Sequence, residues 1–156
     1  IAKKSENHIM ASTVDSSTLT VRISEEIELN GKKLGNSNIH KITGINETSE
    51  RIITALTTGT SIVALGDAAA AGTFIRGDVK YIRITNLDDT NFVRLAIITS
   101  GTDVHVKVPA LDSFIISTGL AGAVADGADV TFDNITSIKA WANTASVDLE
   151  LFVATT

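Results

Sequence analysis

Three histidines are the side chains of this sequence best suited to acid–base chemistry or metal binding, and they are His8, His40 and His105. They stand far apart along the chain, and His105 lies between two valines of an alternating segment, which favours a solvated position on a strand. The sequence contains no HExxH spacing, no Gly-x-Ser-x-Gly turn and no phosphate-binding glycine motif. It also contains no cysteine, which excludes thiolate catalysis, disulfides and cysteine-type zinc sites. We therefore expect a protein that is not an enzyme and has no cofactor.

Two short segments are rich in carboxylate and amide oxygens, which are the ligands that Ca²⁺ prefers. Neither segment has the spacing of a known calcium loop, and Asp and Asn also favour turns because their side chains hydrogen-bond to the local backbone. We interpret both segments as structural turns. The residues are Asn86, Asp88, Asp89 and Asn91 in the first segment and Asp126, Asp129 and Asp133 in the second.

The single tryptophan, Trp141, marks the candidate interaction surface. Two-residue alternation places Trp141 on the same side of a predicted strand as Lys139 and Asn143. The opposite side carries the apolar residues Ile138, Ala140 and Ala142. An outward aromatic ring can stack on a sugar or anchor a subunit contact, or it can cover an open end of the core. Both interpretations of Trp141 stay open at this point.

Composition and charge restrict the class of protein. The chain has 156 residues, of which 44% are hydrophobic and 20% charged, which is typical of one soluble globular domain. Its net charge of −5 makes nucleic acid a poor partner, because an acidic surface repels phosphate. No apolar stretch approaches the roughly 20 residues that span a bilayer, and no signal peptide is recognisable. We expect a soluble protein without a membrane partner.

Alternating apolar and polar residues predict strands along the chain, beginning with 19–29, which ends at the hairpin signal Asn30-Gly31. Residues 46–50 read as a polar loop, and 68–71 is the one place where a helical turn is plausible. Val79–Thr85 and Phe92–Thr99 are expected to form one antiparallel pair. The other predicted strands are 39–45, 52–56, 61–65, 104–108, 114–117, 130–132, 135–142 and 147–153, with a Gly/Ala-rich link at 119–128.

Short strands with turns every 8–12 residues favour an all-β fold, an antiparallel β-sandwich of jelly-roll-like type with little or no helix. We expect residues 1–17 to be a flexible N-terminal extension, of which 1–9 are a tag or upstream sequence. In this hypothesis, residues 11–17 are an N-terminal segment that becomes ordered on a neighbouring subunit. Residues 18–156 are expected to form a single β-sandwich domain.

The run from Phe74 to Leu95, with Phe132-Asp133-Asn134-Ile135 and Ala142-Asn143-Thr144-Ala145 further along, resembles small virion structural proteins of tailed bacteriophages, especially marine and cyanobacterial ones. The resemblance covers roughly residues 70–156 and includes no catalytic residues. It implies a β-rich protein of the virion that serves as a capsid decoration, an appendage of the head or neck, or a tail component.

The expected function is therefore that of a non-catalytic structural protein of a bacteriophage virion. Such a protein binds the capsid or tail surface, contacts the major capsid protein or other virion proteins, and associates with itself, most often as a trimer. The alternative is a carbohydrate- or receptor-binding β-sandwich module of a fibre or adhesin. In that case Trp141, Lys139 and Asn143 would contact a glycan.

Overall fold

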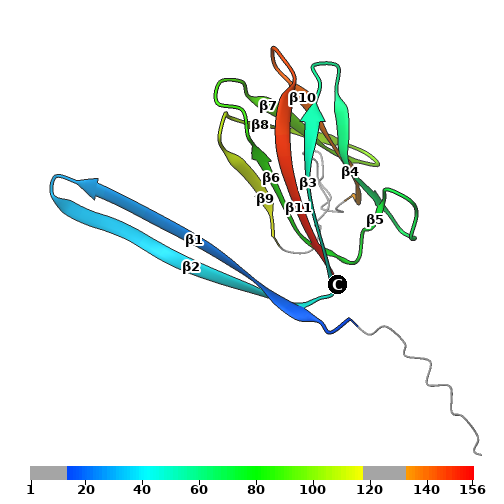
Figure 1. Ribbon diagram of the computed structural model, residues 1–156, viewed down its shortest axis with the longest axis horizontal. Helices are drawn as coiled ribbons and strands as arrows, with labels where there is room; N and C mark the ends of the chain where they lie inside the picture. The colour runs from blue at the N-terminus through cyan, green and yellow to red at the C-terminus, as the bar shows by residue number, and fades with distance from the viewer. Residues whose placement is uncertain (1–13, 118–132) are drawn as a thin grey trace, which may run out of the picture.

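The computed structural model describes residues 14–117 and 133–156, and all regular elements in this part of the chain are β-strands. Two sheets pack face to face as a β-sandwich, and a long hairpin projects from it (Figure 1). This confirms the predicted all-β sandwich, while its jelly-roll-like character stays a prediction. The strands are β1 (Ser17–Leu29), β2 (Lys32–Ile45), β3 (Glu47–Ala55), β4 (Thr60–Gly66), β5 (Phe74–Ile75), β6 (Val79–Asn86), β7 (Val93–Thr99), β8 (Asp103–Val108), β9 (Ser113–Ile116), β10 (Ile135–Ala142) and β11 (Val147–Thr155).

The sandwich consists of a five-stranded sheet in the order β5-β4-β10-β7-β8 and a four-stranded sheet in the order β3-β11-β6-β9. All pairings are antiparallel except the short parallel contact between β4 and β5. Alternation decides which side chains face the core between the sheets. The largest fully buried side chains are Ile62, Ile82, Ile84, Leu95, Ile138, Leu149 and Leu151.

Strand β11 lies in the middle of the four-stranded sheet, between β3 and β6. Its residues Val147, Leu149, Leu151 and Val153 are all buried, as the alternation of the sequence predicts. The intervening side chains, including Phe152, point to the outer face of the sheet. β11 therefore separates the buried core between the sheets from the outer face of the four-stranded sheet.

The predicted pairing of Val79–Thr85 with Phe92–Thr99 is wrong, because the two strands belong to different sheets. β6 lies between β11 and β9, and β7 lies between β10 and β8. The segment between them crosses from one sheet to the other, held by the fully buried side chain of Asn86. The Asn86 amide donates hydrogen bonds to the carbonyl oxygens of Asn91 at 2.8 Å and Pro109 at 2.9 Å. These hydrogen bonds hold the segment between β6 and β7, for which the sequence predicts a hairpin turn.

Two smaller predictions are also corrected. The polar residues 47–50 belong to β3 and not to a loop, because an edge strand exposes most of its side chains and pairs through its backbone with β11. Residues 68–71 form no helical turn; a short bridge joins Ala70 to Thr73 instead. The predicted strand at 130–132 and the link at 119–128 lie outside the described residues.

Strands β1 and β2 form a hairpin of their own and pair with neither sheet of the sandwich. We call this hairpin the arm; in Figure 1 it extends away from the sandwich, starting near the end of the chain. Its turn is Asn30-Gly31, with φ of 51° and 75°, the positive values that a two-residue hairpin turn requires. The sequence predicts one sandwich from residue 18 onward, whereas the sheet pairing of the sandwich begins with β3.

Candidate interaction surfaces

The arm has one apolar and one polar side, because residues opposite each other on β1 and β2 point the same way. Register pairs Ile27 with Leu34 and Leu19 with Ile42 on one side, and Glu28 with Lys33 on the other. The apolar side carries Leu19, Val21, Ile23, Ile27 and Leu29 from β1 with Leu34 and Ile42 from β2. Glu25, between Ile23 and Ile27, lies on the same side, as do the polar β2 residues Lys32, Asn36, Asn38 and His40. The polar side of β1 consists of Thr20, Arg22, Ser24, Glu26 and Glu28.

The outer half of this apolar side has no neighbour in the described part of the chain. We call Ile23, Ile27, Leu29 and Leu34 the distal stripe; their side chains are 50%, 51%, 54% and 44% exposed. Fully burying an isoleucine or leucine contributes about 1.5–3 kcal/mol, so covering the half that is exposed on four residues is worth roughly 3–6 kcal/mol per arm. An isolated two-stranded ribbon is marginally stable in water. The distal stripe is therefore an apolar surface that remains about half exposed in the described part of the chain.

The inner half of the apolar side already has a partner, which is the outer face of the four-stranded sheet. Leu19, Val21 and Ile42 pack against a small cluster that contains Tyr81 and Phe152. The two aromatic rings meet edge to face, with centroids 5.9 Å apart. Burial raises the pKa of the Tyr81 phenol above its ordinary value.

A groove of about 260 Å³ runs along this contact between arm and sheet. Arg83 lines it, and the guanidinium of this residue is paired with Glu150. Both the arm and the sheet contribute apolar and polar side chains to its walls. The residues that line it are Leu19, Thr20, Val21, Tyr81, Arg83 and Phe152.

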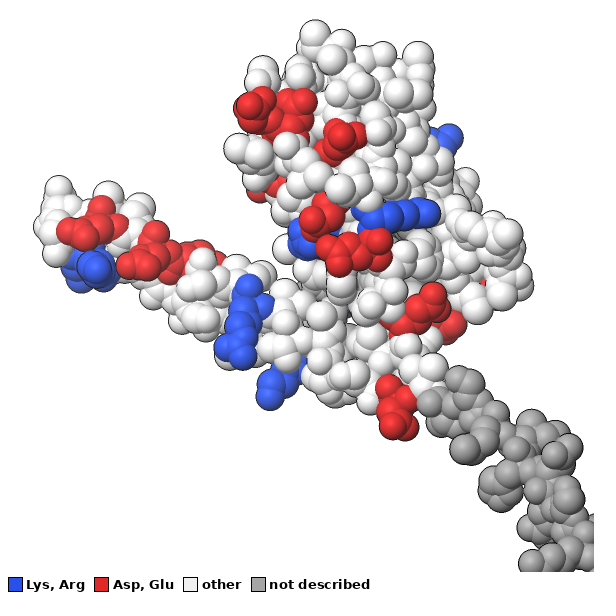
Figure 2. All heavy atoms as spheres, viewed as in Figure 1, with Lys and Arg blue, Asp and Glu red and all other residues white. Residues whose placement is uncertain are grey.

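Charges of both signs follow one another along the arm. Figure 2 shows Lys and Arg side chains at the tip and again nearer the sandwich, with acidic side chains between them. In the sequence these groups are Lys32 and Lys33 at the tip, the run Glu25–Glu28, and then Arg22 with Lys41. The exposed ion pair Lys33–Glu26, at 3.9 Å, contributes little to stability.

Trp141 lies on the outer face of the five-stranded sheet, with the buried residues Ile138, Ala140 and Ala142 on the opposite side of β10. It is half-buried, because Arg94 of the neighbouring strand places its guanidinium carbon 4.7 Å from the ring centroid. Lys139 points outward from the same strand and is exposed, and Asn143 is exposed in the turn after it. A sugar stacking on the indole would have to compete with Arg94 for the ring.

Register adds further cations around Trp141, which the sequence alone did not reveal. Trp141 lies opposite Arg94, and Arg94 lies opposite Lys107 on β8. Two residues further along β7, Ala96 lies between Lys139 of β10 and His105 of β8. The Lys107 ammonium in turn sits 4.4 Å from the centroid of Phe92. This basic–aromatic face stands out on a chain of net charge −5, and finding it requires the strand order β10-β7-β8.

Gly59 supports Trp141 from the turn between β3 and β4. Its φ is +100°, and a Cβ atom at this position would lie 2.5 Å from the indole Nε1. We expect Gly59→Ala to lower the free energy of unfolding by roughly 1–3 kcal/mol, because alanine is strained at this φ and would displace the ring. Denaturant unfolding followed by the fluorescence of the single tryptophan measures the change. Gly77→Ala is the matched control, since a Cβ there meets nothing within 4 Å; equal losses in both variants would contradict the packing role of Gly59.

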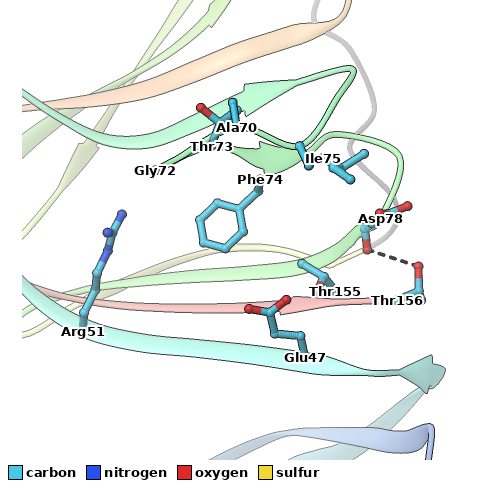
Figure 3. A pocket seen from close by; sticks show the side chains of 11 residues that line it. Glu47, Arg51, Ala70, Gly72, Thr73, Phe74, Ile75, Asp78, Thr155 and Thr156 are labelled. Atoms are coloured by element: carbon cyan, nitrogen blue, oxygen red, sulfur yellow. Dashed lines mark hydrogen bonds between the residues drawn. The ribbon is translucent and has the colours of Figure 1, made fainter. Parts of the chain in front are cut away.

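A cleft of about 320 Å³ opens between the two sheets, at the edge formed by β3 and β5 (Figure 3). Glu47 and Arg51 of β3 and Phe74 of β5 line it, together with the end of the chain at Thr155 and Thr156. The Arg51 guanidinium donates a hydrogen bond to the carbonyl oxygen of Ile62 at 2.9 Å, so it is already engaged within the fold. The lining holds no histidine and no activated nucleophile, and we interpret the cleft as the open edge of the sandwich.

The predicted oxygen-rich turn at 86–91 is present. The Asp88 carboxylate accepts backbone hydrogen bonds from Asn91 and Thr90, which hold the pKa of this carboxyl below its ordinary value. Asp133 accepts a hydrogen bond from the Ser100 hydroxyl at 3.3 Å, while Asp126 and Asp129 lie outside the described residues. Within the described ranges, no group of three or more His, Cys, Asp or Glu side chains is placed to hold a metal ion.

His40 and His105 are both exposed, the first on the arm and the second on β8, and His8 lies outside the described residues.

Comparison with known proteins gives no match to a family model, to a curated protein or to a solved structure. In the described part of the chain, no helix is long and apolar enough to cross a membrane. The surfaces of the molecule itself therefore carry the functional argument.

Proposed function

We propose that the protein is a non-catalytic structural protein that assembles with copies of itself through the arm. The observation that carries this proposal is the distal stripe, four aliphatic side chains that remain about half exposed on a hairpin outside the sandwich. Large exposed apolar patches on soluble proteins mark interaction surfaces, and a ribbon of two strands gains stability when its apolar side is covered. The trimer expected from the sequence stays a prediction.

The resemblance of residues 70–156 to small virion proteins of tailed bacteriophages supports placing this assembly in a virion, as a decoration or appendage protein on the capsid or tail. A second surface is then needed for the particle. We assign that contact to the basic–aromatic face around Trp141, Lys139 and Arg94, because its charge is opposite to that of the chain as a whole. Asn143 lies at the margin of this face in the turn after β10.

The alternative, a carbohydrate- or receptor-binding module, draws its support from Trp141 alone. The indole ring is half-buried, covered in part by Arg94, and backed by Gly59. Sugar-binding platforms present a free ring face, whereas this ring is occupied by a cation from its own sheet. The arm, in contrast, has no role in such a module. Assembly therefore accounts for more of the molecule.

Ile27→Asp tests the assembly. The substitution places a carboxylate in the distal stripe, and we expect the dissociation constant of the assembly to rise on the order of 100-fold, since each contact loses the burial of two isoleucines. Light scattering behind a sizing column, over a range of protein concentrations, gives the mass of each species.

Ile39→Asp is the matched control. Ile39 lies on the same arm and is 49% exposed, against 51% for Ile27, but it points to the polar side opposite Arg22. We expect this variant to assemble like the original protein. A protein that is monomeric without any substitution, or equal weakening in both variants, would overturn assembly through the distal stripe.

A further inference from the structure

We infer that the open edge of β1 pairs with β1 of a second copy, antiparallel and about a two-fold axis at Ser24, so that two arms form one four-stranded sheet. This inference rests on the proposed self-association and names the contact that produces it. Within the described residues, β1 pairs with β2 along one edge, and its other edge carries no strand. Unpaired backbone N–H and C=O groups at such an edge are a template for another strand. A second copy presents the same edge.

The sequence of β1 is complementary to itself when it is reversed about Ser24. Positions at equal distances on either side of Ser24 then lie opposite each other, and every pair occurs twice in the two-fold contact. Leu19 and Val21 meet apolar residues and Arg22 meets a carboxylate, which are pairings that stabilise neighbouring strands, whereas Ile23 meets Glu25. The pairs are Leu19 with Leu29, Val21 with Ile27, Arg22 with Glu26, Thr20 with Glu28 and Ile23 with Glu25 of the second copy.

Neighbouring registers are less favourable. A shift of the axis to Glu25 sets two Glu25 carboxylates opposite each other. An axis between two residues brings the apolar side of one arm to the polar side of the other, because side chains alternate along a strand. The edge of β2 is also a poorer template, since reversal about Ser37 sets Lys33 opposite Lys41. Charge and alternation therefore favour β1 and the axis at Ser24.

The antiparallel pairing also accounts for the groove beside the root of the arm. It brings Leu29 and Ile27 of the second copy next to Leu19 and Val21, which already line the groove with Tyr81 and Phe152. In this pairing, the distal stripe of one arm lies beside Leu19 and Val21 of the other arm. These two residues pack against Tyr81 and Phe152 of their own sandwich, so the apolar contact extends across both copies. A two-fold contact of this kind predicts dimers or even-numbered assemblies, in place of the expected trimer.

Cysteine cross-linking tests the axis directly, because the chain contains no cysteine of its own. Ser24 would face Ser24 of the second copy across an antiparallel pair, with Cα atoms about 4.5–5.5 Å apart, within the range of about 4.4–6.8 Å that a disulfide needs. We expect Ser24→Cys to give a disulfide-linked dimer under mild oxidation, seen on a non-reducing gel. Ser37→Cys is the matched control, since Ser37 is exposed and lies directly opposite Ser24 on the other edge of the same arm.

Cross-linking of Ser24→Cys at least ten times faster than of Ser37→Cys is the expected result. Equal rates, or faster cross-linking of Ser37→Cys, would overturn the β1 pairing. Light scattering on the reduced variants separates this outcome from failure of the proposed function. A multimer without selective cross-linking at residue 24 leaves self-assembly standing and removes only the β1 contact, whereas a monomer removes both.

Discussion

Replacing Asn86 with alanine is expected to lower the free energy of unfolding by about 3 kcal/mol, because its side chain links two loops that run between the sheets. The side chain is fully buried. Its amide nitrogen donates to the carbonyl oxygens of Asn91 and Pro109, and its carbonyl oxygen accepts the backbone N–H of Asp88 at 3.0 Å. Each buried polar group that loses its partner costs about 1–3 kcal/mol.

Equilibrium unfolding in urea or guanidinium measures this loss. Asn143→Ala is the control, since Asn143 is exposed and its side-chain amide donates a hydrogen bond to the neighbouring Thr144 hydroxyl. We expect that variant to stay within about 0.5 kcal/mol of the original protein. A loss below 1 kcal/mol for Asn86→Ala would mean that water replaces the amide in the crossing.

Ile84→Ala is expected to destabilise the sandwich by about 2–5 kcal/mol, through loss of burial and through the cavity that remains. Ile84 is fully buried on β6 and lies opposite Leu151 of β11, which is also buried. The central pair of the four-stranded sheet is therefore packed on the core side with little room for collapse. The same unfolding measurement gives the change.

Ile52→Ala provides the comparison for Ile84→Ala. Ile52 belongs to the same sheet but points to its outer face from the edge strand β3, where it is 66% exposed. We expect a change within about 0.5 kcal/mol, because little burial is lost. A cost at Ile52 as large as that at Ile84 would show that the outer face of β3 is covered in solution.

Local pattern predicted those parts of the fold that depend on neighbours in the sequence. The alternation of Val147, Leu149, Leu151 and Val153 predicted a strand with one buried side, and Asn30-Gly31 predicted the tight turn. Both features need only the period of a strand and the positive φ of a turn. The side to which Trp141 points follows from the same alternation.

Features that depend on distant parts of the chain were not predictable in this way. The sequence around Asn86 predicts a turn. The strand order shows that the chain crosses between the sheets after β6, and Asn86 contacts the distant Pro109 at this crossing. The alternation of β1 is the same whether its apolar side covers a core or projects into solvent, so the arm was not separable from the sandwich. The cations around Trp141 come from three strands whose order the sequence does not state.

The place of β11 in the sheet also orders events during synthesis. The arm is complete once residue 45 has left the ribosome, and its contacts are local, so it can form early. The four-stranded sheet cannot close until residue 155 emerges, because β3 and β6 are held apart by the strand that is made last among those described. The pairing of β1 with β2 is thus possible in the nascent chain while the sandwich is still incomplete.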